Sequence, residues 1–66
     1  MTVTINGEPK ELPDGLTVAA MLAYLAIPAE RVAIERNLDI LARAQWDATP
    51  VQPGDHYEIV HFVGGG

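Results

Sequence analysis

A single amphipathic helix constrains the fold of this 66-residue chain more than any other feature of its sequence. The apolar face of that helix repeats at the i, i+3, i+4 and i+7 spacing and consists of Val18, Met21, Leu22 and Leu25. Thr17 is suited to cap its amino end, and Pro28, which lacks an amide hydrogen, is expected to end it. Because one apolar helical face needs a second layer to cover it, the rest of the chain must supply a sheet.

Short segments on both sides of the helix predict the strands of that sheet. Residues 2–5 and 8–12 flank Asn6-Gly7, a dipeptide that accepts positive φ at both centres of a type I′ hairpin turn. The second of these strands contains Pro9 and three charges, so we expect it at an edge of the sheet. Further strands are predicted at residues 32–35, 39–41 and 56–63.

These elements predict one α+β domain at residues 1–63, followed by a flexible glycine tail at residues 64–66. The helix covers one face of a sheet of four to five strands, and water meets the other face. Trp46, in the irregular segment 42–50, is expected to cover the core. The sequence has no cysteine, which excludes disulfides and thiolate metal sites, so the fold depends on packing alone.

Charge and hydropathy exclude several classes of partner. Nine acidic residues against four basic ones give a net charge of -5, which repels the phosphates of nucleic acids. The longest apolar stretch, residues 16–27, is shorter than the roughly 20 residues that span a bilayer. The segment before it is acidic and lacks the positive region of a secretory signal. We therefore expect a cytoplasmic protein that binds neither nucleic acid nor membrane.

The residue patterns of common catalytic sites are missing from the sequence. It has no serine, no phosphate-binding glycine loop and no H-E-x-x-H motif. His56 and His61 are five residues apart in one strand, so they face opposite sides of the sheet and cannot share a metal ion. We therefore predict no catalytic residue and no metal site.

The C-terminal end of the sequence is its most distinctive chemical feature. An apolar strand runs into Gly64, Gly65 and Gly66 and then a carboxylate. Three extended residues reach about 10 Å, and without Cβ atoms they fit a channel too narrow for other residues. A carboxylate becomes reactive once ATP converts it to an acyl-adenylate, and an unhindered glycine carbonyl suits that activation. The alternative at this point is that the three glycines are only a frayed end or a cloning scar.

The alternation of the last strand predicts an apolar patch beside this tail. His56, Glu58, Val60 and Phe62 share one face, and the two polar residues indicate that this face is the one in water. Val60 and Phe62 are then apolar side chains in solvent, which is typical of an interface. We predict that a partner binds them; the alternative is that residues 42–50 cover them within the domain.

Residues 58–66, EIVHFVGGG, resemble the C-terminus of the ThiS family of thiamine-biosynthesis sulfur carriers. The resemblance extends over the chain and includes the Asn6-Gly7 turn, the helix from Thr17 and the Gly54-Asp55 turn. A third terminal glycine, where many members have two, is the one departure. The resemblance implies a β-grasp, ubiquitin-like fold with a mixed sheet of four to five strands packed on one main helix.

The resemblance also implies a function as a sulfur-carrying co-substrate. A ThiF-like adenylyltransferase would adenylate Gly66, and sulfur from a relay enzyme would replace AMP to give a thiocarboxylate. Thiazole synthase, ThiG, would then take that sulfur into the thiazole of thiamine. Gly64 and Gly65 would form the tether that enters both active sites. ATP and magnesium belong to the activating partner, so no cofactor is expected on this chain.

Three other functions remain open on the sequence alone. The small subunit of molybdopterin synthase resembles this carrier in fold and chemistry but delivers sulfur to a pterin precursor. A ubiquitin-like protein modifier would form conjugates with lysines of target proteins. A structural adaptor would bind its partners equally well with a blocked C-terminus.

Overall fold

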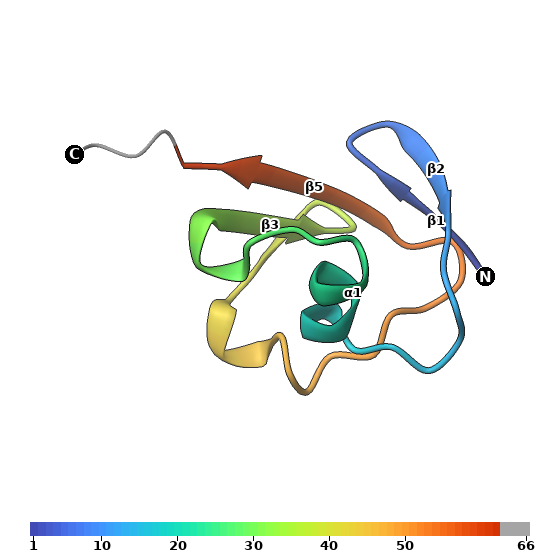
Figure 1. Cartoon of the computed structure of the whole chain (residues 1–66). Coiled ribbons are helices and arrows are strands. Elements are labelled where there is room, and N and C mark those ends of the chain that lie inside the picture. The colour runs from blue at the N-terminus through green and yellow to red at the C-terminus, as the bar shows by residue number, and fades with distance from the viewer. Residues whose placement is uncertain (63–66) are drawn as a thin grey trace.

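Five strands form one sheet within residues 1–62, the part of the chain that the computed structural model describes. The strands are β1 (Thr2–Ile5), β2 (Glu8–Glu11), β3 (Val32–Arg36), β4 (Asp39–Leu41) and β5 (His56–His61). Across the sheet their order is β2-β1-β5-β3-β4. Strands β1 and β5 are parallel and the other neighbouring pairs are antiparallel. The sheet is therefore mixed, and β5 lies at its centre (Figure 1).

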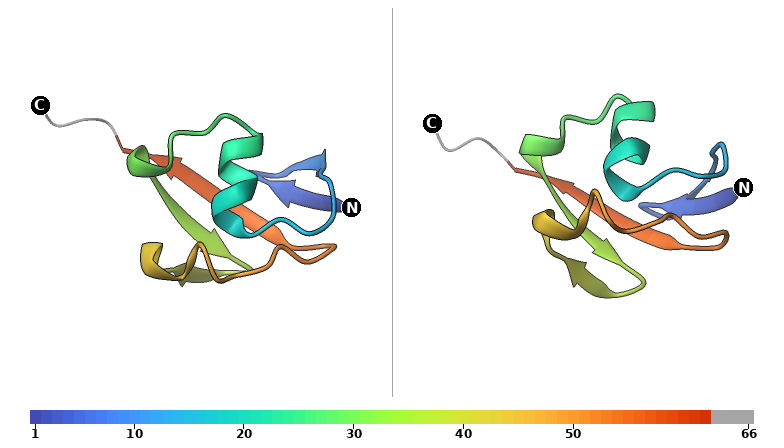
Figure 2. Two further views of the ribbon diagram at one scale, coloured as in Figure 1. Left: turned by 60° about the horizontal axis from the view of Figure 1, so that its bottom comes forward. Right: turned by 90° about the horizontal axis from the view of Figure 1, so that it is seen from below.

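One face of the sheet is covered and the other is open. The helices are α1 (Val18–Tyr24) and the short 3₁₀ helices η1 (Ala29–Arg31) and η2 (Arg43–Gln45). Helix α1 and the segment that leads from η2 to β5 lie on the same side of the sheet (Figures 1 and 2). The buried core between the layers consists of Val3, Ile5, Leu12, Val18, Met21, Leu22, Val32, Ile34, Trp46, Val51, Tyr57 and Ile59. This is the predicted β-grasp arrangement.

Two tight turns connect the antiparallel pairs at the ends of the sheet. Asn6 and Gly7 both have positive φ, 51° and 81°, as the predicted type I′ turn requires. Asn37 and Leu38 have φ of 50° and 75° in the turn between β3 and β4. Strand β2 lies at an edge of the sheet with all four of its residues exposed, as predicted from its proline and charges.

Helix α1 begins as predicted but ends earlier. The Thr17 hydroxyl accepts a hydrogen bond from the Ala20 N–H at 3.1 Å, which confirms the cap. The prediction that Pro28 ends the helix is wrong, since α1 ends at Tyr24. Ala26 has a φ of 57°, its N–H donates to the Ala23 carbonyl, and the Ile27 N–H donates to the Leu22 carbonyl. This is a Schellman motif with alanine at the position where glycine is usual.

Replacing Ala26 by glycine is expected to raise the free energy of unfolding by about 0.5–1 kcal/mol. The left-handed conformation costs an alanine roughly 1–2 kcal/mol, and the greater freedom of glycine in the unfolded chain offsets part of the gain. Urea denaturation followed by circular dichroism measures the change. Ala23→Gly, at an exposed position in the last turn of α1, is the control and should lower the same free energy by up to about 1 kcal/mol. A loss of stability in Ala26→Gly would contradict the assignment.

Strand β5 ends at His61, two residues before the predicted end at residue 63. The Phe62 N–H still donates to the Arg31 carbonyl at 2.8 Å, so the chain follows β3 to that point. Val63 and the predicted tail at residues 64–66 lie outside the described residues. Trp46 is buried as predicted, and its indole N–H donates to the Leu41 carbonyl at 3.0 Å. The helices of residues 1–62 lack the length and apolar character needed to cross a membrane.

Candidate functional site

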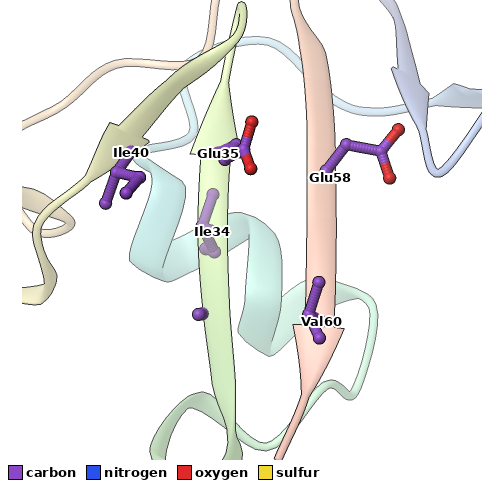
Figure 3. Close-up of a pocket in the computed structure, with 6 residues that line it drawn as sticks. Ile34, Glu35, Ile40, Glu58 and Val60 are labelled. Atoms are coloured by element: carbon purple, nitrogen blue, oxygen red, sulfur yellow. The ribbon is translucent and has the colours of Figure 1, made fainter.

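The open face of the sheet carries a mixed apolar and acidic surface, which we call the open-face patch. It consists of Ala33, Glu35, Ile40, Glu58 and Val60, from strands β3, β4 and β5. Together with Ile34 these residues line a shallow hollow of about 170 Å³ (Figure 3). Ala33 is the register partner of Val60, and its methyl group is too small to fill the space beside that residue. The patch therefore has an open hollow between its apolar side chains.

Large apolar side chains are exposed at Ile40 and Val60 on the open face and at Phe62, which follows β5. The exposed fractions are 84% for Ile40, 60% for Val60 and 54% for Phe62. The predicted exposure of Val60 and Phe62 is confirmed, and the alternative that residues 42–50 cover them is wrong. Ile40 was missed, because only its register beside Glu35 assigns it to the open face. Such a group of exposed apolar residues is typical of a protein interface.

The two glutamates of the open-face patch are directly opposite each other in the sheet. Glu35 of β3 and Glu58 of β5 are register partners, and like charges in this relation are destabilising by a few tenths to about 1 kcal/mol. Figure 3 shows the Glu58 side chain extending away from Glu35. Among residues 1–62, neither carboxylate forms an ion pair or a side-chain hydrogen bond. The chain thus keeps two uncompensated charges on one surface.

The Asn6 side chain holds β5 where its pairing with β1 ends. The last register pair of these strands is Ile5 with Tyr57. Beyond it, the Asn6 amide accepts from the Ile59 N–H at 2.8 Å and donates to the Ile59 carbonyl at 3.1 Å. A side chain thereby replaces a strand neighbour at this point. It satisfies the backbone of β5 just before the segment that carries Val60 and Phe62.

A buried carboxylate at the start of β5 was missed by the sequence analysis, which assigned this segment only to a turn. Asp55 is 5% exposed. It accepts hydrogen bonds from the Gln52 N–H at 2.9 Å, the Tyr57 hydroxyl at 2.8 Å, the Asn37 amide at 3.2 Å and the Arg36 Nε at 3.1 Å. We call these residues the Asp55 network. It ties the β3–β4 turn to the beginning of β5 and so fixes the register in which Glu35 meets Glu58.

Burial and hydrogen bonds within the Asp55 network shift the pKa values of Asp55 and Tyr57. Burial by itself raises the pKa of the Asp55 carboxyl, but the hydrogen bonds from Gln52, Tyr57, Asn37 and Arg36 outweigh it and hold that pKa below 3.8. Burial, together with the bond to Asp55, raises the pKa of Tyr57 from 10.0 to about 12. At neutral pH the network therefore contains a carboxylate anion that accepts from a protonated phenol.

These two pKa values predict how stability depends on pH. The depressed pKa of Asp55 gives stability that is present above 3.8 and is lost as the pH falls through the lower, folded value. The raised pKa of Tyr57 gives stability that is present below pH 10 and is lost as the pH rises toward about 12. Urea titrations at several pH values should therefore show the advantage of the unaltered chain over Tyr57→Phe shrinking between pH 10 and 12. A constant difference would contradict the raised pKa of Tyr57.

The predicted reactive group and its tether belong to the segment that follows β5. Gly66, with Gly64 and Gly65, lies outside the residues that the structure describes. The structure does describe the strand that leads toward them, which is the central strand of the sheet and carries Val60 next to the open-face hollow. Of the predicted site, Val60 and Phe62 are thus brought to one end of the molecule.

Comparison with known proteins matches the chain to one family and to several named relatives. The model of the ThiS family matches residues 3–66. Thiazole synthase of Paramagnetospirillum magneticum is 41% identical over the whole chain, which spans 20% of that protein. Sulfur carrier protein ThiS of Bacillus subtilis is 35% identical over 94% of the chain and 96% of its own length. The crystal structure of a thiamine biosynthesis protein (ThiS) from Geobacter metallireducens is 39% identical, with a TM-score of 0.85 and full coverage of both chains.

Proposed function

The chain belongs to the ThiS family, and from this premise we propose that it is a sulfur carrier protein of thiamine biosynthesis, a co-substrate and not an enzyme. The observation that carries the proposal is the family match itself, because it extends over residues 3–66 and so includes the three terminal glycines. The high coverage of a named sulfur carrier from Bacillus subtilis supports it.

The proposed chemistry takes place on the carboxylate of Gly66. A ThiF-like adenylyltransferase, which binds ATP and magnesium, joins that carboxylate to AMP and releases pyrophosphate. The outer sulfur of a persulfide on a sulfur-relay enzyme then displaces AMP and forms an acyl disulfide with the carrier. A partner's thiol attacks the relay sulfur of that disulfide, forms a new disulfide and releases the carrier as a thiocarboxylate. Thiazole synthase consumes the thiocarboxylate and returns the carrier. This chain contributes the acyl group and the means of presenting it, and the partners supply the catalytic residues.

The last residues of this chain give a partner access to the reacting carboxylate and a surface to bind. Gly64 and Gly65 have no Cβ, so a partner can close its active site around them without leaving space for a side chain. Val60 and Phe62, which are more than half exposed, offer apolar contact area immediately before this tether. A partner that binds them orients the carrier while the last residue reaches the reacting atoms.

Mass spectrometry of the chain isolated from cells that make thiamine tests the proposal. Replacement of one oxygen by sulfur adds about 16 mass units, which is also the nominal shift of methionine oxidation at Met1 or Met21. Fragmentation must therefore locate the added mass on Gly66. An unmodified Gly66 in cells that are actively forming the thiazole ring would contradict the proposal.

The chain isolated from these cells also separates the proposed function from the remaining alternatives. A thiocarboxylated chain that is consumed by molybdopterin synthase instead of thiazole synthase would support the pterin pathway. Conjugates with lysines of other proteins would support a protein modifier. A carrier that functions with a blocked C-terminus would be a structural adaptor. The match to the ThiS family favours the thiamine carrier over all three.

Phe62→Asp is expected to reduce adenylation of the carrier by about tenfold or more without changing its fold. The substitution puts a charge into an apolar contact, and central apolar residues contribute most to such interfaces. Adenylation is measured as pyrophosphate release by the purified activating enzyme. Tyr24→Asp, at a side chain that is 57% exposed on α1, is the matched control and should adenylate normally. Normal adenylation of Phe62→Asp with a native circular dichroism spectrum would refute the docking role.

A further inference from the structure

We propose that the open-face patch binds an arginine side chain of thiazole synthase, placed between Glu35 and Glu58 with its aliphatic stem against Ile40 and Val60. This inference rests on the proposed function, because it assumes that the synthase receives the carrier. It adds a specific contact, and the chemical type of the partner's side chain, to the predicted docking residues Val60 and Phe62.

The first support is a charge arrangement that the chain does not compensate. Glu35 and Glu58 are opposite each other, and none of the ion pairs formed within residues 1–62 includes either of them. Of the four basic residues, Lys10 pairs with Glu8 and Arg36 with Asp55. Arg31 forms no ion pair with either patch glutamate within residues 1–62. A cation from another protein would relieve the repulsion and make the patch more favourable when bound than when free.

Arg43 is a third basic side chain that the fold already uses. Its guanidinium donates to the backbone carbonyls of Ala29 and Val32 and lies over the Trp46 ring, with its carbon 4.5 Å from the ring centroid. These contacts hold Arg43 at the covered side of the domain. It therefore does not serve as the cation of the open-face patch.

The second support is the apolar frame around the two charges. Ile40 and Val60 flank a hollow of about 170 Å³ whose floor is formed at Ala33, the residue with the smallest side chain of the set. An arginine combines an aliphatic stem, which packs on such residues, with a planar guanidinium whose five donors can meet two carboxylates at once. Lysine would supply a point charge without that geometry. The combination of hollow, aliphatic walls and two acceptors fits arginine best.

The third support is the small number of residues between the end of β5 and the reacting group. Four residues follow Phe62 in the sequence, and four fully extended residues span at most about 14 Å. A protein that holds Gly66 in its active site must therefore bring its surface close to the end of β5, where Val60 lies. The Paramagnetospirillum thiazole synthase contains a segment that matches this entire chain, which favours a synthase as the occupant.

Binding of purified thiazole synthase to the full chain tests the inference. Glu35→Gln combined with Glu58→Gln removes the two charges and keeps the shape of the side chains. The matched control is Glu8→Gln combined with Asp47→Asn, which removes two exposed charges outside the patch. Isothermal titration at about 50 and 300 mM salt should show binding weakened about tenfold or more in the patch variant at low salt and within twofold in the control.

A second readout separates binding from folding. Because the patch variant loses a like-charge contact, it should unfold at the same or a higher urea concentration than the unaltered chain. Lower affinity without lower stability is the result expected of a docking site. The affinity of the patch variant should also depend less on salt than the affinity of the unaltered chain does.

Four results would overturn the inference. Equal binding by the patch variant and the unaltered chain would do so while the proposed function stands. An equal loss in the control would mean that net charge alone attracts the synthase. A dimer of the free chain that dissociates in the patch variant would identify a second copy as the occupant. Failure of the unaltered chain to bind the synthase at either salt concentration would overturn the proposed function as well.

Discussion

A chain that lacks Gly65 and Gly66 should transfer no sulfur to thiazole synthase and should unfold at the same urea concentration as the complete sequence. The loss is expected to be complete, because the acyl group that is adenylated would end two residues short of the activating enzyme's reacting atoms, and orientation of this kind controls rate very steeply. The buried core consists of residues between Val3 and Ile59, so the free energy of unfolding should change by less than about 0.5 kcal/mol.

The deletion is measured by restoration of thiamine synthesis in a strain without its own carrier, and by adenylation of the purified chain. Gly66→Ala is the matched control, since it keeps the length and the carboxylate and adds one methyl group. We expect this control to lose only part of its adenylation and of the restored thiamine synthesis. A smaller loss than in the truncated chain would separate the effect of the carboxylate's position from the effect of a narrow partner channel. Restored thiamine synthesis by the truncated chain would contradict the proposed function.

Asp55→Ala should lower the free energy of unfolding by about 3 kcal/mol. The substitution removes the acceptor for the buried Tyr57 hydroxyl, the Arg36 guanidinium, the Asn37 amide and the Gln52 N–H. Donors that are left without a partner carry the desolvation cost of the lost bonds, and Arg36 remains as a partly buried charge. A chain of this size has roughly 3–10 kcal/mol in total, so the substitution should remove from about a third to nearly all of the free energy of unfolding.

Thermal and urea denaturation followed by circular dichroism measure this effect. Asp47→Ala removes an exposed carboxylate from the loop after η2 and is the control, with an expected change below about 0.5 kcal/mol. Asp55→Asn should fall between the two, because its amide keeps one oxygen to accept hydrogen bonds but lacks the charge that faces Arg36. Native stability in Asp55→Ala would show that solvent replaces the carboxylate without cost.

Local patterns predicted the parts of the fold that nearby residues determine. The Asn6-Gly7 turn and the Thr17 cap each depend on groups within three residues, so the local sequence is enough to predict them. The end of α1 was predicted incorrectly, because Ala26 adopts a conformation that its residue type disfavours. The backbone bonds of the Schellman motif and the packing around it outweigh that preference, and neither is visible in the residue pattern.

The sequence predicted those site residues whose face of the sheet follows from alternation along one strand. It missed those whose position depends on how two strands pair. Val60 and Phe62 follow from the alternation of one strand. Ile40 belongs to the patch because β4 pairs with β3 in one particular register, which a three-residue segment does not specify. Asp55 was missed because Arg36 and Asn37, its side-chain donors from the β3–β4 turn, are 19 and 18 residues away in sequence.

The central position of β5 has a mechanical consequence. The strand that leads to the carrier's terminus is hydrogen-bonded to β1 on one side and to β3 on the other (Figure 1). A pulling force applied along β5 would be shared by both ladders in shear, and Tyr57 and Ile59 would have to leave the core before the strand could slide. A pull on the C-terminal end of β5 is therefore resisted by two neighbouring strands and by the core at the same time.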